Sequence, residues 1–167
     1  VFSKDVARLT RSITYDTSLD NPAALEAFRQ ETVNPLIAGR TEPLVISEEE
    51  FSTSTPSSEV SPDAIADRLM ALFPQARILI TIRRQQDAIP SLYTHMCEMG
   101  LVKNIDFNRW FDFNFATEAG QSVYDYAQVT ERYANRFGAR RVHLVPFEWM
   151  RDDPQTFVST VCSLMSV

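Results

Sequence analysis

The chain has 167 residues, of which 44% are hydrophobic and 23% charged, so it is long enough and apolar enough to fold as one domain with a substantial core. This composition argues against disorder, and no apolar run approaches the roughly 20 residues of a membrane-spanning helix. The formal net charge of −6, with acidic and basic residues interspersed, excludes a general nucleic-acid surface, so a bound anion needs a local basic cluster.

The first third of the chain predicts two helices, one strand and a loop. Residues 3–10 and 22–38 have helical spacing of apolar side chains, and Asn21-Pro22 suits the start of the second helix. Residues 44–46 (Leu-Val-Ile), followed by a serine and three glutamates, are typical of a buried strand in a parallel sheet. Residues 52–58 are rich in Ser and Thr and predict a loop, either a plain connector or a mobile lid.

The rest of the chain alternates between helices and strands. Ser61-Pro62-Asp63 predicts a helix start, and residues 76–82 predict a strand that is apolar on both faces. A helix follows from Asp87, its expected N-cap, to Met99, and Gly100 ends it. Three further elements are expected at 120–137 (helix), 141–147 (strand) and 154–165 (helix). This order predicts a single α/β domain over residues 1–167, a parallel sheet flanked by helices.

An anion site is predicted where the strand 76–82 ends at Arg83 and Arg84. Ligands of open α/β sheets bind beyond the carboxyl ends of the strands, and the next helix points its N-terminal N–H groups there. Pro90 and Ser91 are expected in the first turn of that helix, with the Ser91 hydroxyl facing the anion. A guanidinium matches phosphate oxygens well, which makes Arg83 the expected anchor. Solvated or ion-paired arginines are an equally good interpretation of this stretch alone.

Three stretches, in order, resemble the sulfotransferase family that uses 3′-phosphoadenosine 5′-phosphosulfate. Residues 72–83 and Ser91 resemble that family's Phe-Pro helix end, buried strand, Arg, and Ser eight residues on. Residues 44–49 (LVISEE) resemble its strand ending in a Ser-Ser-Glu type sequence. Residues 142–154 resemble its late strand, its Tyr-Glu-Asp-Leu sequence and the Asp-Pro opening of the next helix. The resemblance covers roughly residues 42–167.

The resemblance implies a P-loop NTPase-like fold that is incomplete at its N-terminus. It implies transfer of a sulfuryl group from 3′-phosphoadenosine 5′-phosphosulfate to a hydroxyl or amine, without a metal, and it assigns the donor's 3′-phosphate to Arg83 and Ser91. The acceptor is expected to be a small molecule, a carbohydrate or a lipid. The chain is predicted to be cytoplasmic, or from the Golgi lumen if an anchor lies upstream.

The chain departs from the family's pattern at two places. The proline that usually follows the arginine by two residues is Gln85 here. The glycine- and lysine-bearing loop for the 5′-phosphosulfate is missing, because four glycines, at 39, 100, 120 and 138, cannot build it. We expect this loop just upstream of Val1. Two alternatives stay open: a non-catalytic sulfotransferase-like binding module, and a kinase-type transferase of P-loop fold, which needs an Asp at a strand end for Mg²⁺.

The sequence does not assign the general base. Glu48 is the best candidate because it follows a strand that is expected to end at the correct edge of the sheet, although successive glutamates often form a solvated helix start. Glu26 and Asp20 are weaker candidates. His95 and His143 fit structural or surface positions better than catalytic ones.

The remaining candidates are aromatic residues and cysteines. Trp110, Phe111, Phe113 and Phe115 either line an acceptor pocket or, as is more common, pack as core. Cys97 and Cys162 are predicted to be buried reduced thiols on different helices, and no Cys or His spacing indicates a zinc site.

Overall fold

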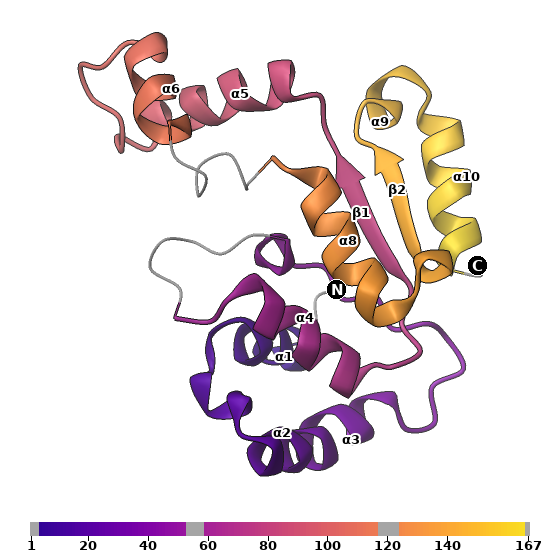
Figure 1. Ribbon diagram of the computed structural model, residues 1–167. Helices are drawn as coiled ribbons and strands as arrows, with labels where there is room; N and C mark the ends of the chain where they lie inside the picture. The colour runs from indigo at the N-terminus through magenta and orange to yellow at the C-terminus, as the bar shows by residue number, and fades with distance from the viewer. Residues whose placement is uncertain (1–3, 53–58, 117–123, 166–167) are drawn as a thin grey trace.

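The computed structural model describes residues 4–52, 59–116 and 124–165 (Figure 1). In chain order the elements are α1 (Lys4–Tyr15), η1 (Thr17–Asp20), α2 (Pro22–Phe28), η2 (Arg29–Val33), α3 (Asn34–Ile37), η3 (Glu49–Phe51), α4 (Pro62–Leu72), β1 (Ile78–Ile82), α5 (Gln85–Glu98), α6 (Phe107–Phe115), α8 (Tyr126–Phe137), η4 (Ala139–Arg141), β2 (Val142–Pro146), α9 (Trp149–Asp152) and α10 (Pro154–Met165).

The two strands pair in parallel. Ile78 lies opposite Val142, and the register runs through to Ile82 opposite Pro146. The long crossover between the strands contains α5, α6 and α8, and α8 packs against both strands (Figure 1). The mixed α/β architecture with a parallel sheet, predicted from the alternation of strands and helices, is therefore confirmed.

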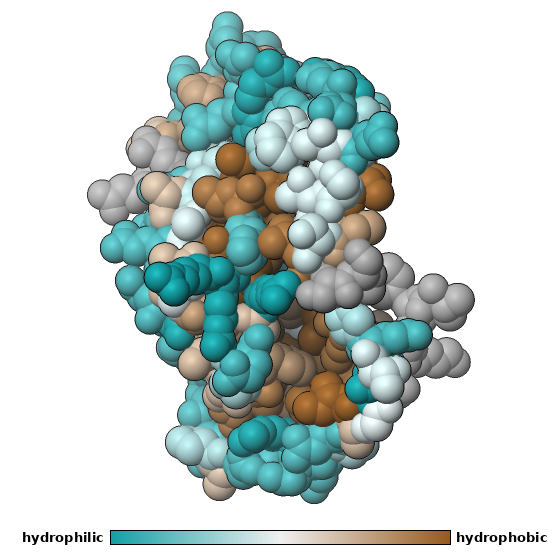
Figure 2. Space-filling view, turned by 90° about the vertical axis from the view of Figure 1, so that its right-hand side faces the viewer, coloured by the Kyte–Doolittle hydropathy of each residue, from teal (hydrophilic) through white to brown (hydrophobic). Residues whose placement is uncertain are grey.

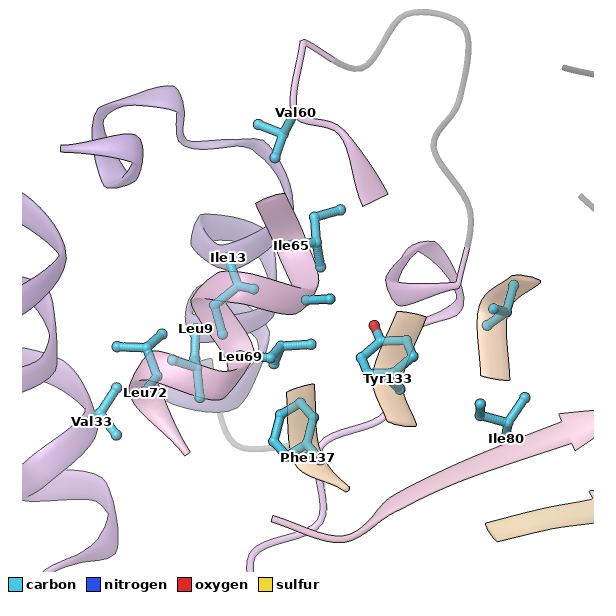
Figure 3. Packing of buried hydrophobic residues seen from close by; sticks show 12 residues of the cluster. Leu9, Ile13, Val33, Val60, Ile65, Leu69, Leu72, Ile80, Tyr133 and Phe137 are labelled. Carbon is cyan, nitrogen blue, oxygen red and sulfur yellow. The ribbon is translucent and has the colours of Figure 1, made fainter. Parts of the chain in front are cut away.

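The main core lies between the helices α1, α4 and α8 and the covered face of the sheet (Figure 3). Its fully buried or nearly buried side chains include Leu9, Ile13, Ile65, Leu69, Leu72, Ile80, Tyr133 and Phe137. One charged side chain enters this layer. Arg68 of α4 is only 2% exposed, and it donates to the Ile13 carbonyl oxygen at 2.8 Å and to the Asp20 carboxylate at 2.7 Å. Arg68 thereby joins α4 to the end of α1 and to η1.

The predicted strand at residues 44–46 is wrong. These residues have no regular structure, and in the described part of the chain the sheet consists of β1 and β2 alone. Ile46 packs against the main core while Val45 is exposed, so the apolar run is buried on one side only. In the described chain no strand lies beside it to pair with.

The strand predicted over residues 76–82, with both faces apolar, is β1 (Ile78–Ile82), and it is buried on one face only. Ile80 is buried under the helices, whereas Leu79 on the other face is 40% exposed and Thr81 is exposed as well. The reason is that only the α8 side of β1 is covered by the helices of the described chain.

The helices are close to their predicted positions with some changes of boundary. The helix expected over 22–38 is α2, a π-helical turn η2 and α3 in succession, and α1 continues to Tyr15. Gly100 and Gly138 follow α5 and α8 with positive φ of 71° and 84°, as expected for residues that end helices. Residues 53–58, which are most of the loop predicted over 52–58 as a connector or a lid, lie outside the described residues, and so do residues 120–123 of the predicted long helix.

The side of the molecule formed by β2 and α10 carries exposed apolar side chains. Figure 2 looks at this side and shows hydrophobic residues gathered across the middle of it. Leu144 of β2 and Val158 of α10 are both exposed. None of the helices in the described part of the chain has the length and apolar content that crossing a bilayer requires.

The helical core predicts a large difference between two leucine truncations. Leu9 is fully buried and Leu101 is 64% exposed, so Leu9→Ala opens a cavity and Leu101→Ala does not. We expect Leu9→Ala to lower the free energy of unfolding by about 2–5 kcal/mol and Leu101→Ala by less than about 0.5 kcal/mol. Urea denaturation measures both, and equal losses would contradict the described packing.

Candidate functional site

The parallel register brings the carboxyl ends of β1 and β2 to one edge of the sheet. Arg83 and Arg84 follow β1 there, and Phe147 and Glu148 follow β2. The Phe147 N–H donates to the Ile82 carbonyl oxygen at 2.7 Å, so the strands stay joined up to this edge. These four residues, called the strand-end edge below, are the centre of the candidate site.

Arg84 is held by two carboxylates. Its Nε lies 2.9 Å from the Asp87 carboxylate and 3.6 Å from that of Glu148, and its backbone N–H donates to Glu148 Oε1 at 2.9 Å. The hydrogen bond from the Arg84 N–H, followed by the nearby guanidinium charges, lowers the pKa of Glu148. Arg84 is therefore neutralised locally and is a poor anchor for a further anion.

Arg83 is placed differently. Its guanidinium carbon lies over the Phe147 ring, 5.3 Å from the ring centroid, and its backbone N–H donates to the Tyr126 hydroxyl oxygen at 3.3 Å. Within the described residues no carboxylate forms an ion pair with the Arg83 side chain, whereas the nearby Arg151 pairs with Asp152 at 2.7 Å. The strand-end edge thus holds one half-buried guanidinium whose charge is not neutralised by an ion pair.

The N-terminus of α5 lies directly after these arginines. Arg84, with extended ψ of 126°, is the N-cap residue, and no side chain in the described chain caps the helix. The prediction of Asp87 as N-cap is wrong because the N-cap lies three residues earlier and Asp87 pairs with Arg84 instead. The uncapped N–H groups and the helix dipole add to the positive potential beside Arg83.

Ser91 lies further along α5 than expected. It is exposed and is the seventh residue of the helix, roughly 9 Å along the axis from Gln85, and Pro90 is an interior residue instead of a first-turn one. Ser91 shares a helix face with Asp87 and Arg84, which precede it by four and seven residues. No contact in the described chain joins Ser91 to Arg83, so its role as a ligand stays a prediction.

Two tyrosines adjoin the strand-end edge. Tyr126 contacts Arg83 as described, and the Gln85 side chain donates to the Tyr124 carbonyl oxygen at 3.0 Å. Burial raises the pKa of Tyr124, the neighbouring Tyr126 adds to the increase, and Arg83 opposes it. The segment that leads into α8 is therefore fixed to the beginning of α5. Neither tyrosine was singled out from the sequence.

The candidate bases lie away from direct contact with Arg83. The Glu48 carboxylate accepts a hydrogen bond from the Glu49 N–H at 3.0 Å and so caps η3. The next residue, Glu49, lies close enough to Tyr124 for its charge to raise the pKa of that tyrosine. The helical turn η3, which begins at Glu49, therefore lies near Tyr124. Asp20 pairs with the buried Arg68, and Glu26 pairs with Arg29 at 3.5 Å. Both carboxylates thus form ion pairs with arginines of the helical layer.

The aromatic stretch packs as a small core of its own. Helices α5 and α6 form an arm that extends away from the sheet (Figure 1). Trp110 is 4% exposed and lies 5.3 Å from the Tyr93 ring and 5.8 Å from the Phe115 ring. Phe113 is 83% exposed and does not take part in this packing. Phe111 stacks on Phe115 at 4.9 Å between ring centroids, so the packing interpretation describes Trp110, Phe111 and Phe115. Phe115 also lies 5.8 Å from the ring of Tyr124, which adjoins the strand-end edge.

The histidines and cysteines lie outside the strand-end edge. His95 is exposed on α5 and His143 is half-buried in β2. Cys97 of α5 and Cys162 of α10 are free thiols on different helices as predicted, although they are half-buried and not buried. In the described part of the chain no three His, Cys, Asp or Glu side chains are grouped to hold a metal ion.

Glu148 was missed as a site residue by the sequence reasoning, although a glutamate directly after the second strand was visible. Parallel strands of equal length end at the same edge, so the residue after β2 was bound to meet the residues after β1. That rule, applied to both strands instead of to β1 alone, identifies Phe147 and Glu148 without a structure.

Comparison with known proteins identifies a family for the chain. The family model described as "Sulfotransferase family" matches residues 14–167. No curated protein matches the chain. The crystal structure of a sulfotransferase from Alicyclobacillus acidocaldarius is similar in fold, with a TM-score of 0.55 and 26% sequence identity over 63% of this chain. The match covers 45% of that protein, so the chain spans less than half of its length.

The attachment of η3 to α8 predicts a pH-dependent stability. The buried Tyr133 hydroxyl donates to the Phe51 carbonyl oxygen at 2.5 Å, and burial raises the pKa of Tyr133 to about 12. The folded chain therefore keeps this proton at a pH where the unfolded chain, with a tyrosine pKa of about 10, loses it. The resulting stabilisation is complete below about pH 10 and is lost as the pH rises toward 12.

We expect the free energy of unfolding to fall by about 1 kcal/mol more in the unaltered protein than in Tyr133→Phe between about pH 9 and 11. Urea denaturation at the two pH values measures this difference. Tyr15→Phe is the matched control because Tyr15 is 48% exposed. A Tyr133→Phe protein that loses as much stability as the unaltered one would contradict the raised pKa.

Proposed function

The chain belongs to the sulfotransferase family, and we propose that it carries the 3′-phosphate half of a site for 3′-phosphoadenosine 5′-phosphosulfate, with Arg83 as anchor. The full proposed reaction is transfer of a sulfuryl group from this donor to a hydroxyl or amine acceptor. The acceptor class is proposed to be a small molecule, a carbohydrate or a lipid.

The observation that carries the proposal is the difference between the two adjacent arginines. Arg84 is ion-paired to Asp87 and Glu148, whereas Arg83 stacks on Phe147 and has no ion pair within the described residues. The uncapped start of α5 lies beside it. A phosphate dianion fits this arrangement, because a guanidinium and free helix N–H groups both donate to phosphate oxygens. The residues present therefore fit the 3′-phosphate of the donor.

The work of this chain in the reaction is binding and orientation. When bound, the donor supplies the sulfuryl group for in-line transfer. Arg83 binds the 3′-phosphate and so limits the motion of the nucleotide. Ser91 is the proposed second ligand of the same phosphate. Removal of the acceptor proton needs a base, and Glu48 is proposed for it: its carboxylate is half-buried and forms no ion pair with an Arg or Lys of the described chain.

The kinase-type alternative is less well supported. In the described chain neither strand of the sheet is followed by an aspartate that is free to hold Mg²⁺: β1 leads to Arg83 and β2 to Phe147-Glu148. Glu148 is hydrogen-bonded to Arg84. The other alternative is a non-catalytic binding module. It would bind the nucleotide at the same anion site but would not transfer the sulfuryl group.

The first test asks whether Arg83 recognises a 3′-phosphate. By isothermal titration calorimetry we expect adenosine 3′,5′-bisphosphate to bind more tightly than adenosine 5′-monophosphate. Arg83→Ala is expected to weaken binding of the bisphosphate by about tenfold or more, because a charge-assisted contact contributes about 1.5–3 kcal/mol. The same substitution should leave the affinity for the monophosphate nearly unchanged.

Arg140→Ala is the matched control for this experiment. Arg140 is exposed in η4, which precedes β2 and so lies at the opposite end of the sheet, and its removal causes the same change in net charge. An equal preference for the two nucleotides in the unaltered protein would overturn the assignment. Binding without sulfuryl transfer to any acceptor would favour the non-catalytic module.

A second test concerns Ser91. Because a neutral hydroxyl contributes less than a guanidinium, Ser91→Ala is expected to weaken bisphosphate binding by about two- to tenfold. Ser163→Ala, an exposed serine of α10, serves as control. An unchanged affinity in Ser91→Ala would remove Ser91 from the site and leave Arg83 in it.

A further inference from the structure

Two residues after β2 contact both arginines after β1. The Phe147 ring lies beneath the Arg83 guanidinium, with 5.3 Å between the guanidinium carbon and the ring centroid. Glu148 accepts the Arg84 N–H at 2.9 Å and lies 3.6 Å from the Arg84 Nε. These contacts connect segments that are 64 residues apart in the chain.

The contact with Phe147 restrains Arg83 without using its hydrogen-bond donors. A cation over an aromatic face is attracted by the ring quadrupole, and the N–H groups of a guanidinium lie in its plane. An arginine held in this way keeps its donors available for phosphate oxygens and loses less conformational freedom when an anion binds. The backbone of Phe147 is held in place, because its N–H donates to the Ile82 carbonyl oxygen at 2.7 Å, and the residue as a whole is 38% exposed.

Glu148 acts on the neighbouring residue. Its bond to the Arg84 N–H holds the N-cap residue of α5, and therefore the direction in which the helix leaves the sheet. Together with Asp87, Glu148 also neutralises the Arg84 guanidinium. Arg83 is then the arginine of this pair that is available to bind an anion. The Glu148 side chain is 16% exposed, whereas its partner Arg84 is 51% exposed, so the arginine side of this contact is open to solvent.

We propose that Phe147 and Glu148 are positioning residues for the anion site: Phe147 holds the Arg83 guanidinium in its binding orientation, and Glu148 fixes the turn from β1 into α5 and withdraws Arg84 from the anion. This inference rests on the proposed function, since it assumes that Arg83 binds the 3′-phosphate. It assigns to the end of β2 a part in binding that does not involve contact with the ligand.

The test measures binding of adenosine 3′,5′-bisphosphate by calorimetry in matched pairs of variants. Phe147→Leu is expected to weaken binding by about three- to fivefold, and Phe147→Tyr, which keeps the aromatic face, by less than about twofold. Glu148→Ala is expected to weaken binding by about five- to tenfold, and Glu148→Gln, which keeps an acceptor for the Arg84 N–H, by a smaller factor. Phe113→Leu on α6, at an 83% exposed position, is the control for loss of a phenyl ring.

A double-mutant cycle distinguishes positioning from a general effect on the fold. If Phe147 acts through Arg83, Phe147→Leu should have no further effect in a protein that already carries Arg83→Ala. A loss of the same size in both backgrounds would overturn the inference, and so would unchanged binding in Phe147→Leu and Glu148→Ala when Arg83→Ala alone weakens it. Failure of the unaltered protein to prefer the bisphosphate would instead overturn the proposed function, and this inference with it.

Discussion

The parallel pairing of β1 with β2 is the constraint on which the rest of the structure depends. The register that ends at Ile82 and Pro146 brings the residues after both strands to one edge, although they are far apart in sequence. A two-stranded sheet is not stable alone in water, so the packing of α8 on both strands is what maintains the pair. The helices α1 and α4 support α8 in turn through the main core. The hydrophobic packing beneath the sheet thus determines the geometry of the proposed anion site.

Local pairing of charges explains how an acidic chain can offer an anion site. The strand-end edge and its surroundings contain three arginines and three carboxylates, and the carboxylates of Asp87, Glu148 and Asp152 are matched to Arg84 and Arg151. The positive charge of Arg83 therefore acts at one point while the protein as a whole carries −6. The proposed preference of this edge for a phosphate rests on this distribution of partners more than on the number of basic residues.

Much of the fold was predictable because it is encoded locally. The two strands, the glycines after α5 and α8, and the capping serine of α4 follow from patterns within a few residues. One error came from information that is not local. Residues 44–46 have the composition of a strand, but no strand of the described chain lies beside them to pair with. The error at Asp87 is local by contrast: Asp87 has the character of an N-cap, but it pairs with Arg84 three residues before it. The difference between Arg83 and Arg84 was only partly visible: Asp87 lies close to Arg84 in sequence, but Glu148 and Phe147, which follow the second strand, also set the two arginines apart.

The arm of α5 and α6 has its own aromatic core around Trp110, separate from the core beneath the sheet. A substitution that changes the size or shape of one core therefore does not require a compensating change in the other. Insertions or new surfaces on the arm therefore leave the packing beneath the sheet, and with it the position of the strand-end edge, largely undisturbed. The separation of the two cores divides the described chain into one part whose packing sets the edge and one part whose packing does not.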